Sequence, residues 1–249
     1  MTKRLLILGG IGEAAELALK AKEACGDTLD VISSLAGRLQ SRPDIAGEVR
    51  VGGFGGGRGL AEYIQREHID LLIDATHPFA QGISETAYDA SILTQTPRLI
   101  LTRPSWQLPP NAKWLEADNF EDAARLVGDI SRCAFLTTGR GNIDAFSNIR
   151  NVRFVVRLIE PPDKPLPLTD ADIVIGRPPF SVEDERQLIR DYEIDTLVTK
   201  NSGGEKTTAK LTAALDEDIR IILIRRPPPE PGEITSTVTD ALKWIQGRL

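Results

Sequence analysis

Short apolar runs alternate with stretches of helical periodicity along almost the whole chain. In the first hundred residues, the apolar runs predict strands over 4–8, 29–33, 48–51, 71–75 and 98–102, and apolar residues at helical spacing predict helices over 13–22, 60–67 and 84–93. Strands that alternate with helices in this way form a parallel sheet that is covered on both faces. The fold class predicted is therefore α/β.

The second part of the chain repeats the alternation. The predicted strands cover 113–115, 134–137, 152–157, 173–175, 196–199 and 219–224, and the predicted helices cover 120–130, 182–192, 207–215 and 238–246. Between the two parts, 103–110 contains three prolines, which continue neither a strand nor a helix. We therefore expect two domains, 1–103 and 104–249.

The two parts also resemble each other in sequence. Residues 68–80 align without gaps on 193–205, and the strands at 99–104 and 5–10 have counterparts at 222–227 and 133–138. Three elements recur in the same order, which predicts two similar Rossmann-like lobes with parallel sheets. Such lobes bind ligands where strand ends meet, so we expect a ligand cleft between them.

Composition narrows the class of function. The 249 residues carry 30 Lys and Arg against 36 Asp and Glu, and the net charge of −6 argues against nucleic acid or an anionic membrane as the main partner. No run approaches the roughly 20 apolar residues of a membrane span, and the first residues lack the pattern of a signal peptide. Two cysteines and two histidines make a zinc or iron site improbable. We expect a cytoplasmic protein without a metal.

The first apolar strand ends in Gly9, Gly10, Ile11 and Gly12 and is followed directly by a helix. Glycines let a backbone approach a pyrophosphate, and the amides and dipole of a helix N-terminus favour that anion. Ala15 stands where the full dinucleotide fingerprint has its third glycine. The alternative is a tight turn without a ligand. We expect Glu13 to point away from the anion.

The end of the second strand indicates which dinucleotide would bind. An NAD site places a carboxylate there for the ribose 2′-hydroxyl, whereas this chain has Ser33 and Ser34 followed by Arg38. Hydroxyl donors and a guanidinium suit a 2′-phosphate, so the pattern favours NADPH. The alternative for Arg38 is a solvated turn.

Two further loops follow strands of the first lobe. The glycine-rich run 52–59 precedes a helix and could be a second phosphate loop, a hinge or a lid, and we favour a mobile loop that borders the cofactor. In 74–80, Pro78 holds His77 out of the helical region of backbone conformation. His77 has three possible roles: proton donor, contact to nicotinamide, or packed polar residue.

Loops at the strand ends of the second lobe combine basic and glycine residues. Residues 137–142 contain Arg140, and 199–204 contain Lys200 with an amide, a hydroxyl and two glycines before a helix. Arg140, Arg177 and Lys200 would face the cleft from three strand ends and suit a substrate with several carboxylates. The alternative is a helix cap among surface basic residues.

Together these motifs resemble the precorrin-6A reductase family of cobalamin biosynthesis, in both its metal-free and its cobalt-precorrin forms. The matching pieces, in family order, are 7–10, 12–14, 36–38, 52–56, 73–80, 138–140, 199–204 and 209–211. Two positions depart from the family pattern. Ile11 replaces a frequent threonine and would remove a hydroxyl contact, and Pro178 replaces the usual glycine, which leaves the role of Arg177 open.

The resemblance implies an NADPH-dependent oxidoreductase that reduces one CH–CH type double bond of precorrin-6A, with hydride to C19 and a proton to C18. It implies Lys200 and His77 as catalytic residues and neighbouring pathway enzymes as candidate partners. The implied cofactor contacts are Gly9, Gly10, Ile11, Gly12, Ser33, Ser34, Arg38, Thr76, His77 and Phe79. The implied substrate contacts are Thr138, Gly139, Arg140, Arg177, Lys200, Asn201, Ser202, Gly203 and Gly204.

Two other functions compete with this one, and only the second of them is not enzymatic. A short-chain dehydrogenase would need a Tyr-x-x-x-Lys pair, but Tyr63, Tyr88 and Tyr192 are followed four residues later by Glu, Ile and Thr. A non-enzymatic protein with two lobes would bind the same kind of ligand. Oxidation of NADPH with turnover of a tetrapyrrole separates that binding protein from an enzyme.

Overall fold

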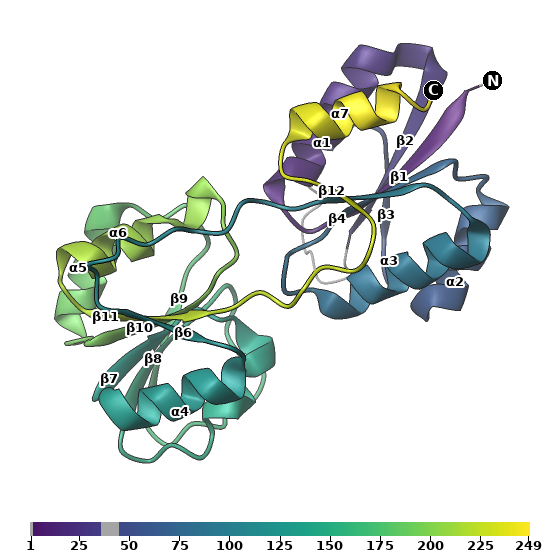
Figure 1. The fold of residues 1–249 in the computed structure, drawn as a ribbon. Helices are drawn as coiled ribbons and strands as arrows, with labels where there is room; N and C mark the ends of the chain where they lie inside the picture. Colours follow the sequence, from purple (N-terminus) through teal and green to yellow (C-terminus); the bar gives the residue numbers. More distant parts are fainter. Residues whose placement is uncertain (1, 36–44) are drawn as a thin grey trace. The chain divides into compact units, whose positions relative to one another are not determined.

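The computed structural model describes residues 2–35 and 45–249 and divides the chain into two compact units (Figure 1). The first unit contains the residues up to Pro104 together with Pro227–Leu249, and the second contains Ser105–Arg226. Each unit has one six-stranded sheet in which every strand pairing is parallel. The predicted α/β class with two Rossmann-like lobes is confirmed.

The first sheet has the strand order β12-β5-β4-β1-β2-β3. Its strands are β1 (Lys3–Gly9), β2 (Leu29–Leu35), β3 (Glu48–Val51), β4 (Leu71–Ala75), β5 (Arg98–Leu101) and β12 (Glu233–Thr235). Its helices are α1 (Gly12–Cys25), α2 (Gly56–Arg66), α3 (Gln81–Thr94) and α7 (Val238–Gln246), with a short 3-10 turn, η1, at Gly26–Thr28. In Figure 1, α1 and α7 lie side by side on one face of the sheet, and α2 and α3 lie on the other.

The second sheet has the strand order β6-β11-β10-β7-β8-β9. Its strands are β6 (Trp114–Ala117), β7 (Cys133–Leu136), β8 (Arg153–Leu158), β9 (Ala171–Ile175), β10 (Thr196–Lys200) and β11 (Arg220–Ile224). The helices are α4 (Phe120–Ile130), α5 (Val182–Asp191) and α6 (Ala209–Asp216), with 3-10 segments η2 (Arg140–Phe146) and η3 (Glu205–Thr207). The order β5-β4-β1-β2-β3 of the first sheet corresponds to β11-β10-β7-β8-β9 of the second. The sequence repeat predicts three of these five pairs, namely β1 with β7, β4 with β10 and β5 with β11.

The outermost strand at one side of the first sheet comes from the C-terminal end of the chain. β12 follows β11 along the chain but pairs with β5, whereas β6 pairs with β11 inside the second unit. The predicted second domain, 104–249, is therefore corrected at its C-terminal end, because Pro227–Leu249 belongs to the first unit. The sequence pattern did not reveal β12, since this three-residue strand directly follows a segment with four prolines.

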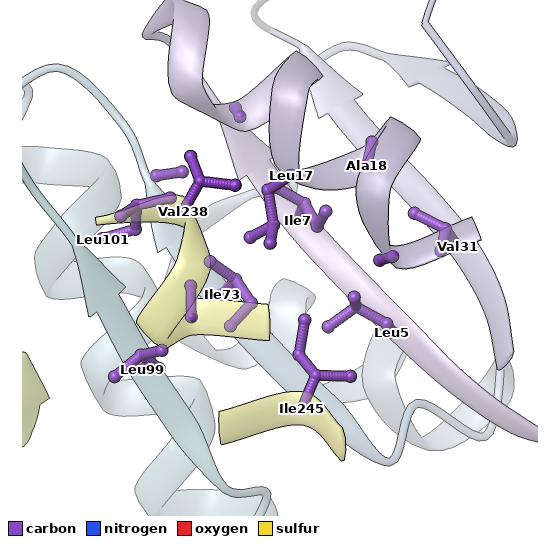
Figure 2. Packing of buried hydrophobic residues seen from close by; sticks show 14 of the residues in the cluster. Leu5, Ile7, Leu17, Ala18, Val31, Ile73, Leu99, Leu101, Val238 and Ile245 are labelled. Atoms are coloured by element: carbon purple, nitrogen blue, oxygen red, sulfur yellow. The ribbon is translucent and has the colours of Figure 1, made fainter. Parts of the chain in front are cut away.

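The returning segment completes the core on one face of the first sheet. Alternate residues of β1 point to opposite faces, so Leu5 and Ile7 pack on the side of α1 while Leu6 and Leu8 pack on the side of α2. Figure 2 shows Val238 and Ile245 of α7 against Leu5, Ile7 and the neighbouring strands. Val238 is 7 % exposed and Ile245 is fully buried. Burial of such a side chain stabilises by about 1.5–3 kcal/mol, so α7 is an integral part of this unit.

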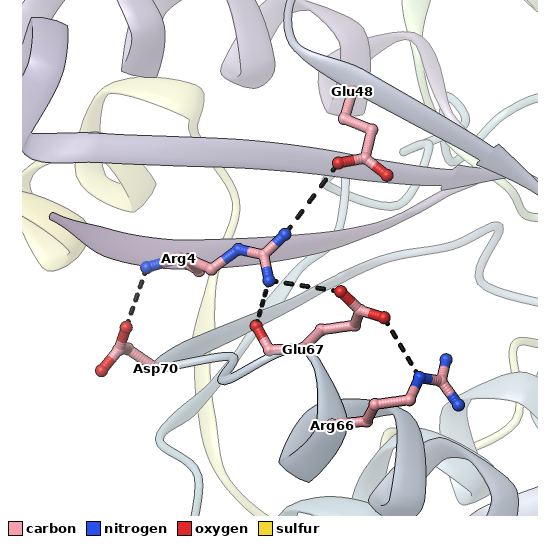
Figure 3. A network of polar contacts seen from close by, with 5 residues as sticks. All are labelled: Arg4, Glu48, Arg66, Glu67 and Asp70. Carbon is pink, nitrogen blue, oxygen red and sulfur yellow. Dashed lines mark hydrogen bonds and ion pairs between the residues drawn. The ribbon is translucent and has the colours of Figure 1, made fainter.

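A polar network ties the amino ends of the first sheet together (Figure 3). The Arg4 guanidinium contacts the carbonyl and the carboxylate of Glu67, and it lies 4.0 Å from Glu48. Asp70 accepts a hydrogen bond of 2.8 Å from the Arg4 amide. Hydrogen bonds from Arg66 and Arg4 lower the pKa of the Glu67 carboxyl. These contacts fix the edge of the sheet opposite the predicted binding loops.

The glycine-rich run differs from its prediction. α2 begins at Gly56, four residues before the predicted start, so Gly57 and Gly59 are helical. A Cβ at Gly59 would lie 1.8 Å from the Phe54 carbonyl oxygen, and one at Gly57 would lie 2.6 Å from Cβ of Asp89 in α3. These glycines therefore serve close packing of α2, and the expectation that all of 52–59 forms a loop is wrong.

None of the helices in the described ranges is both long and apolar enough to cross a membrane. No group of three His, Cys, Asp or Glu residues in those ranges is arranged as a metal site would require. Cys25 and Cys133 are free thiols, and burial raises the pKa of each.

Candidate functional site

The predicted binding loops of the first unit meet at the carboxyl edge of its sheet. Gly10 and Ile11 follow β1, the segment 52–55 follows β3, and 76–80 follows β4. Because these strands are parallel and β4, β1, β2 and β3 are successive neighbours, their following loops lie along one edge. This is the edge at which open α/β sheets bind ligands.

Gly10 joins two of these loops by close contact. A Cβ there would lie 2.9 Å from the His77 amide nitrogen and 3.1 Å from Cα of Thr76, so the contact requires glycine. Gly9 is also tight, because an added Cβ would lie 3.0 Å from Leu35. Ile11 is 8 % exposed and belongs to the core beside α1, which leaves only its backbone for a ligand. Packing alone thus accounts for part of the glycine pattern.

The start of α1 is arranged to accept an anion. Its N-cap residue is Ile11, whose apolar side chain makes no capping hydrogen bond. Glu13 in the first turn binds the Arg103 guanidinium at 2.9 Å, so its charge is compensated. The unsatisfied amides and the helix dipole therefore remain the dominant electrostatic feature of this turn.

The helices that follow the loops after β1, β3 and β4 share one feature at their N-termini. Their N-cap residues are Ile11, Gly55 and Ala80, and none of the three makes a side-chain capping hydrogen bond. In contrast, Asn119, Ser181 and Thr237 cap α4, α5 and α7 with hydrogen bonds to backbone amides, and α5 follows the predicted segment that contains Arg177. N-termini without a side-chain cap in the first unit are what anion binding at its loops would need.

A buried carboxylate shapes the loop after β4. Asp74 is 2 % exposed, and its Oδ1 accepts hydrogen bonds from the Thr76 amide at 3.1 Å and the Thr76 hydroxyl at 2.7 Å. The Thr76 hydroxyl also lies 3.2 Å from the hydroxyl of Ser84 in α3. The side chain of Thr76 is therefore engaged in holding the turn.

The same loop fixes the tautomer of His77. Its Nδ1 accepts a hydrogen bond of 3.2 Å from the Phe79 amide, and the two rings are 5.9 Å apart. A nitrogen that accepts carries no proton, so the neutral imidazole has its proton on Nε2. Protonation of Nδ1 would break the bond that orients the ring. The geometry favours a hydrogen-bond donor over an acid that releases the Nδ1 proton.

The end of β2 presents two buried hydroxyls. Ser33 is 3 % exposed, and its Oγ has no hydrogen-bond partner in the described parts of the chain. Ser34 is 6 % exposed, and its Oγ accepts a bond of 3.1 Å from Arg50. Arg38, the predicted phosphate ligand, lies outside the described residues. Arg50 was missed by the sequence reasoning, because only the pairing of Ser34 with Arg50 across β2 and β3 brings the two together.

In the second unit, the segment after β10 is held by Trp106. The Trp106 amide donates to Oδ1 of Asn201 at 2.8 Å, and its indole donates to the Gly204 carbonyl at 3.1 Å. The amide group of Asn201 therefore helps to hold the strand-end loop. Lys200 is the last residue of β10, and burial lowers its pKa. Ser202 is 8 % exposed within the same loop.

The predicted arginines of the second unit lie on its surface and contact one acidic segment. Arg140 is 3.2 Å from Asp163, and Arg177 is 2.7 Å from Glu160. All four side chains are substantially exposed, and exposed ion pairs contribute only about 0–1 kcal/mol. A substrate carboxylate could therefore replace Glu160 or Asp163 at little cost. Thr138 is 1 % exposed with no hydroxyl partner among the described residues, and Gly139 follows it at a φ of 78°.

Lys210 in the first turn of α6 is a functional candidate to which the sequence reasoning gave no role. Its Nζ lies 5.5 Å from the centre of the Trp106 ring. Burial lowers its pKa to about 8, with Arg157 and Lys200 acting in the same direction and Glu185 opposing them. Glu185 is bound by Arg157 through two hydrogen bonds of 2.5 and 2.9 Å, so its charge is largely compensated. Lys200 and Lys210 together form a positive group that could bind an anion.

Two parallel sheets with glycine-containing loops at the carboxyl ends of their strands define a Rossmann-like α/β protein of two units. The chain belongs to the precorrin-6x reductase CbiJ/CobK family, whose model matches residues 4–246. This confirms the family resemblance of the sequence motifs and makes the chain a member of a reductase family.

Individual relatives match over nearly the full length. Precorrin-6A reductase from Rhodococcus erythropolis is 43% identical over 243 residues, which cover 97% of each chain. Cobalt-precorrin-6A reductase from Priestia megaterium is 27% identical and covers 96% of each chain. A solved structure of CobK precorrin-6A reductase superimposes with a TM-score of 0.91 at 34% identity and covers 99% of this chain and 97% of its own.

The environment of Lys210 leads to a titration prediction. Lysine side chains carrying a carbon label at Cε should include a signal that titrates near pH 8, because burial favours the neutral amine of Lys210. Lys210→Gln should remove this step, whereas Lys113→Gln, at an exposed lysine, should leave it unchanged. Persistence of the step in Lys210→Gln would contradict the assignment.

Proposed function

We propose that this chain reduces precorrin-6A with NADPH in cobalamin biosynthesis, adding hydride to C19 and a proton to C18 of the macrocycle. The observation that carries the proposal is full-length similarity to a precorrin-6A reductase, together with a loop set in each unit that suits one of the two reactants. The more similar of the two relatives above is named for the metal-free compound, so we take metal-free precorrin-6A as the substrate.

The first unit suits NADPH. Amides of Gly10, Ile11 and Gly12 at the uncapped start of α1 would receive the pyrophosphate, with Gly9 setting the turn. The Ser33 hydroxyl, which has no partner among the described residues, and the Ser34 hydroxyl would bind the adenosine ribose and its phosphate. β2 itself ends without a carboxylate. Arg38 is a further ligand on sequence grounds. When bound, NADPH supplies the hydride.

The loop after β4 would orient the nicotinamide. Asp74 holds Thr76, and the Phe79 amide holds His77 with its Nε2–H as the donor. A donor in this place can hold the carboxamide oxygen of nicotinamide and so fix the face of the ring. His77 would then act by positioning the hydride donor.

The second unit suits a polycarboxylate macrocycle. Lys200, at the end of β10, would hold a carboxylate electrostatically, and the backbone of 202–204 would supply amides beside it. Arg140 and Arg177 would bind further carboxylates in place of Asp163 and Glu160. Thr138 and Gly139, after β7, would border the same group.

Turnover with labelled cofactor tests the function. Purified protein, precorrin-6A and NADPH carrying deuterium at the transferred C4 position should give oxidised cofactor and one deuterium at C19, observed by NMR. Without precorrin-6A, the cofactor should remain reduced. Binding of both molecules without oxidation would support the non-enzymatic alternative, and deuterium at another carbon would refute the C19 assignment.

Two His77 variants separate positioning from proton donation. His77→Gln can place a donor near the Nε2 position, whereas His77→Asn keeps an acceptor for the Phe79 amide but loses that donor. Loss of one hydrogen bond of about 1.4 kcal/mol should raise the KM for NADPH about tenfold in His77→Asn, with a smaller effect in His77→Gln. Steady-state kinetics would contradict this role if both variants lost kcat while their KM values stayed unchanged.

A further inference from the structure

The end of the β2–β3 pair holds an arginine that no part of the proposed reaction has yet used. Arg50 of β3 pairs with Ser34 of β2, and the two side chains meet at the carboxyl edge of the sheet. The Arg50 guanidinium donates to Oγ of Ser34 at 3.1 Å. It also donates to the carbonyls of Gly52 at 2.9 Å and Gly53 at 3.0 Å.

Aromatic rings hold this guanidinium in place from one side. Its central carbon lies 3.7 Å from the centre of the Phe54 ring and 5.0 Å from that of Tyr63. The two rings pack edge to face at 5.2 Å, and Tyr63 is a buried residue of α2. Arginine stacks on aromatic faces while its N–H groups remain in the guanidinium plane. The charged group is thus fixed before any ligand arrives.

The charge of Arg50 is not compensated by a carboxylate of the described residues. Its hydrogen-bond partners in those residues are one hydroxyl and two carbonyl groups, all neutral. Three of its five N–H groups make these bonds, which leaves two that no described residue accepts. Ser34 accepts from Arg50 and still has its own hydroxyl proton to donate. A positive group and a hydroxyl donor therefore converge at one point.

We propose that Arg50 and Ser34 bind the 2′-phosphate of NADPH and that Arg50 sets the preference for NADPH over NADH. This inference rests on the proposed function, because it assumes that the first unit binds the dinucleotide. The end of β2 is where a dinucleotide-binding sheet distinguishes the two cofactors. A phosphate dianion accepts charge-assisted bonds from a guanidinium, whereas the 2′-hydroxyl of NADH gains little from an added positive charge.

Support of the 52–54 loop is the competing explanation of these contacts. The two carbonyl bonds do brace that loop, but a brace requires only neutral donors. It does not account for an uncompensated guanidinium beside the Ser34 hydroxyl. The two explanations differ in what they predict for NADH, since a brace would matter for both cofactors and a phosphate ligand for one.

Cofactor discrimination in matched variants tests the proposal. The full-length protein, Arg50→Gln and Arg66→Gln would be titrated calorimetrically with NADPH and NADH. Arg66 is the control because its guanidinium lies 5.2 Å from the same Tyr63 ring and its removal changes the net charge equally. Arg50→Gln should weaken NADPH by about 10- to 100-fold and leave NADH within about twofold, whereas Arg66→Gln should change neither.

Two more variants distinguish loss of a phosphate ligand from a folding defect. Arg50→Lys keeps the charge and should retain part of the preference for NADPH. Ser34→Ala should weaken NADPH several-fold without an effect on NADH. Equal losses for both cofactors in Arg50→Gln, or no loss of NADPH affinity in either Arg50→Gln or Ser34→Ala, would overturn the inference. Failure of the wild-type protein to bind NADPH would instead overturn the proposed function and this inference with it.

Discussion

Parallel strand pairing is the constraint on which the candidate site depends. Each strand of a parallel sheet must be followed by a crossover, so all carboxyl ends lie on one edge and their loops become neighbours. In the first unit this brings together 10–12, 52–55 and 76–80, which are far apart in sequence. Gly10 then allows the loops after β1 and β4 to touch. A larger residue at this position would separate the α1 anion site from His77.

After the second unit, the chain returns to the first, which contains Pro227–Leu249. The repeated core of five strands is the same in both sheets. The first sheet is completed by β12 from the C-terminal end of the chain, whereas the second is completed by β6 from within its own segment. α7 follows β12 and fills the face beside α1 with Val238 and Ile245. The two units therefore share a fold, but only the second is formed by one continuous stretch of chain, Ser105–Arg226.

Much of the fold could be predicted from the sequence, because buried parallel strands produce apolar runs and amphipathic helices produce a periodic pattern. The helices α4 and α7 match their predicted bounds, and the repeat gives the correspondence between the sheets. β12 could not be predicted, since its three residues are stabilised by pairing with β5 and carry little pattern of their own. The roles of Arg50 and Lys210 could not be predicted for a related reason. Their surroundings arise from tertiary contacts, of Arg50 with Ser34 and of Lys210 with Trp106. The predicted binding loops could be identified from the sequence, because glycine and basic residues directly follow apolar runs.

Hydrogen exchange of the backbone amides tests most directly whether the two units bind different reactants. NADPH alone should slow exchange at 10–13 and 33–35, and precorrin-6A alone should slow it at 202–210. The start of α4, capped by Asn119, should respond to neither and serves as the internal reference. Protection of 202–210 by NADPH, with 10–13 unchanged, would contradict the account.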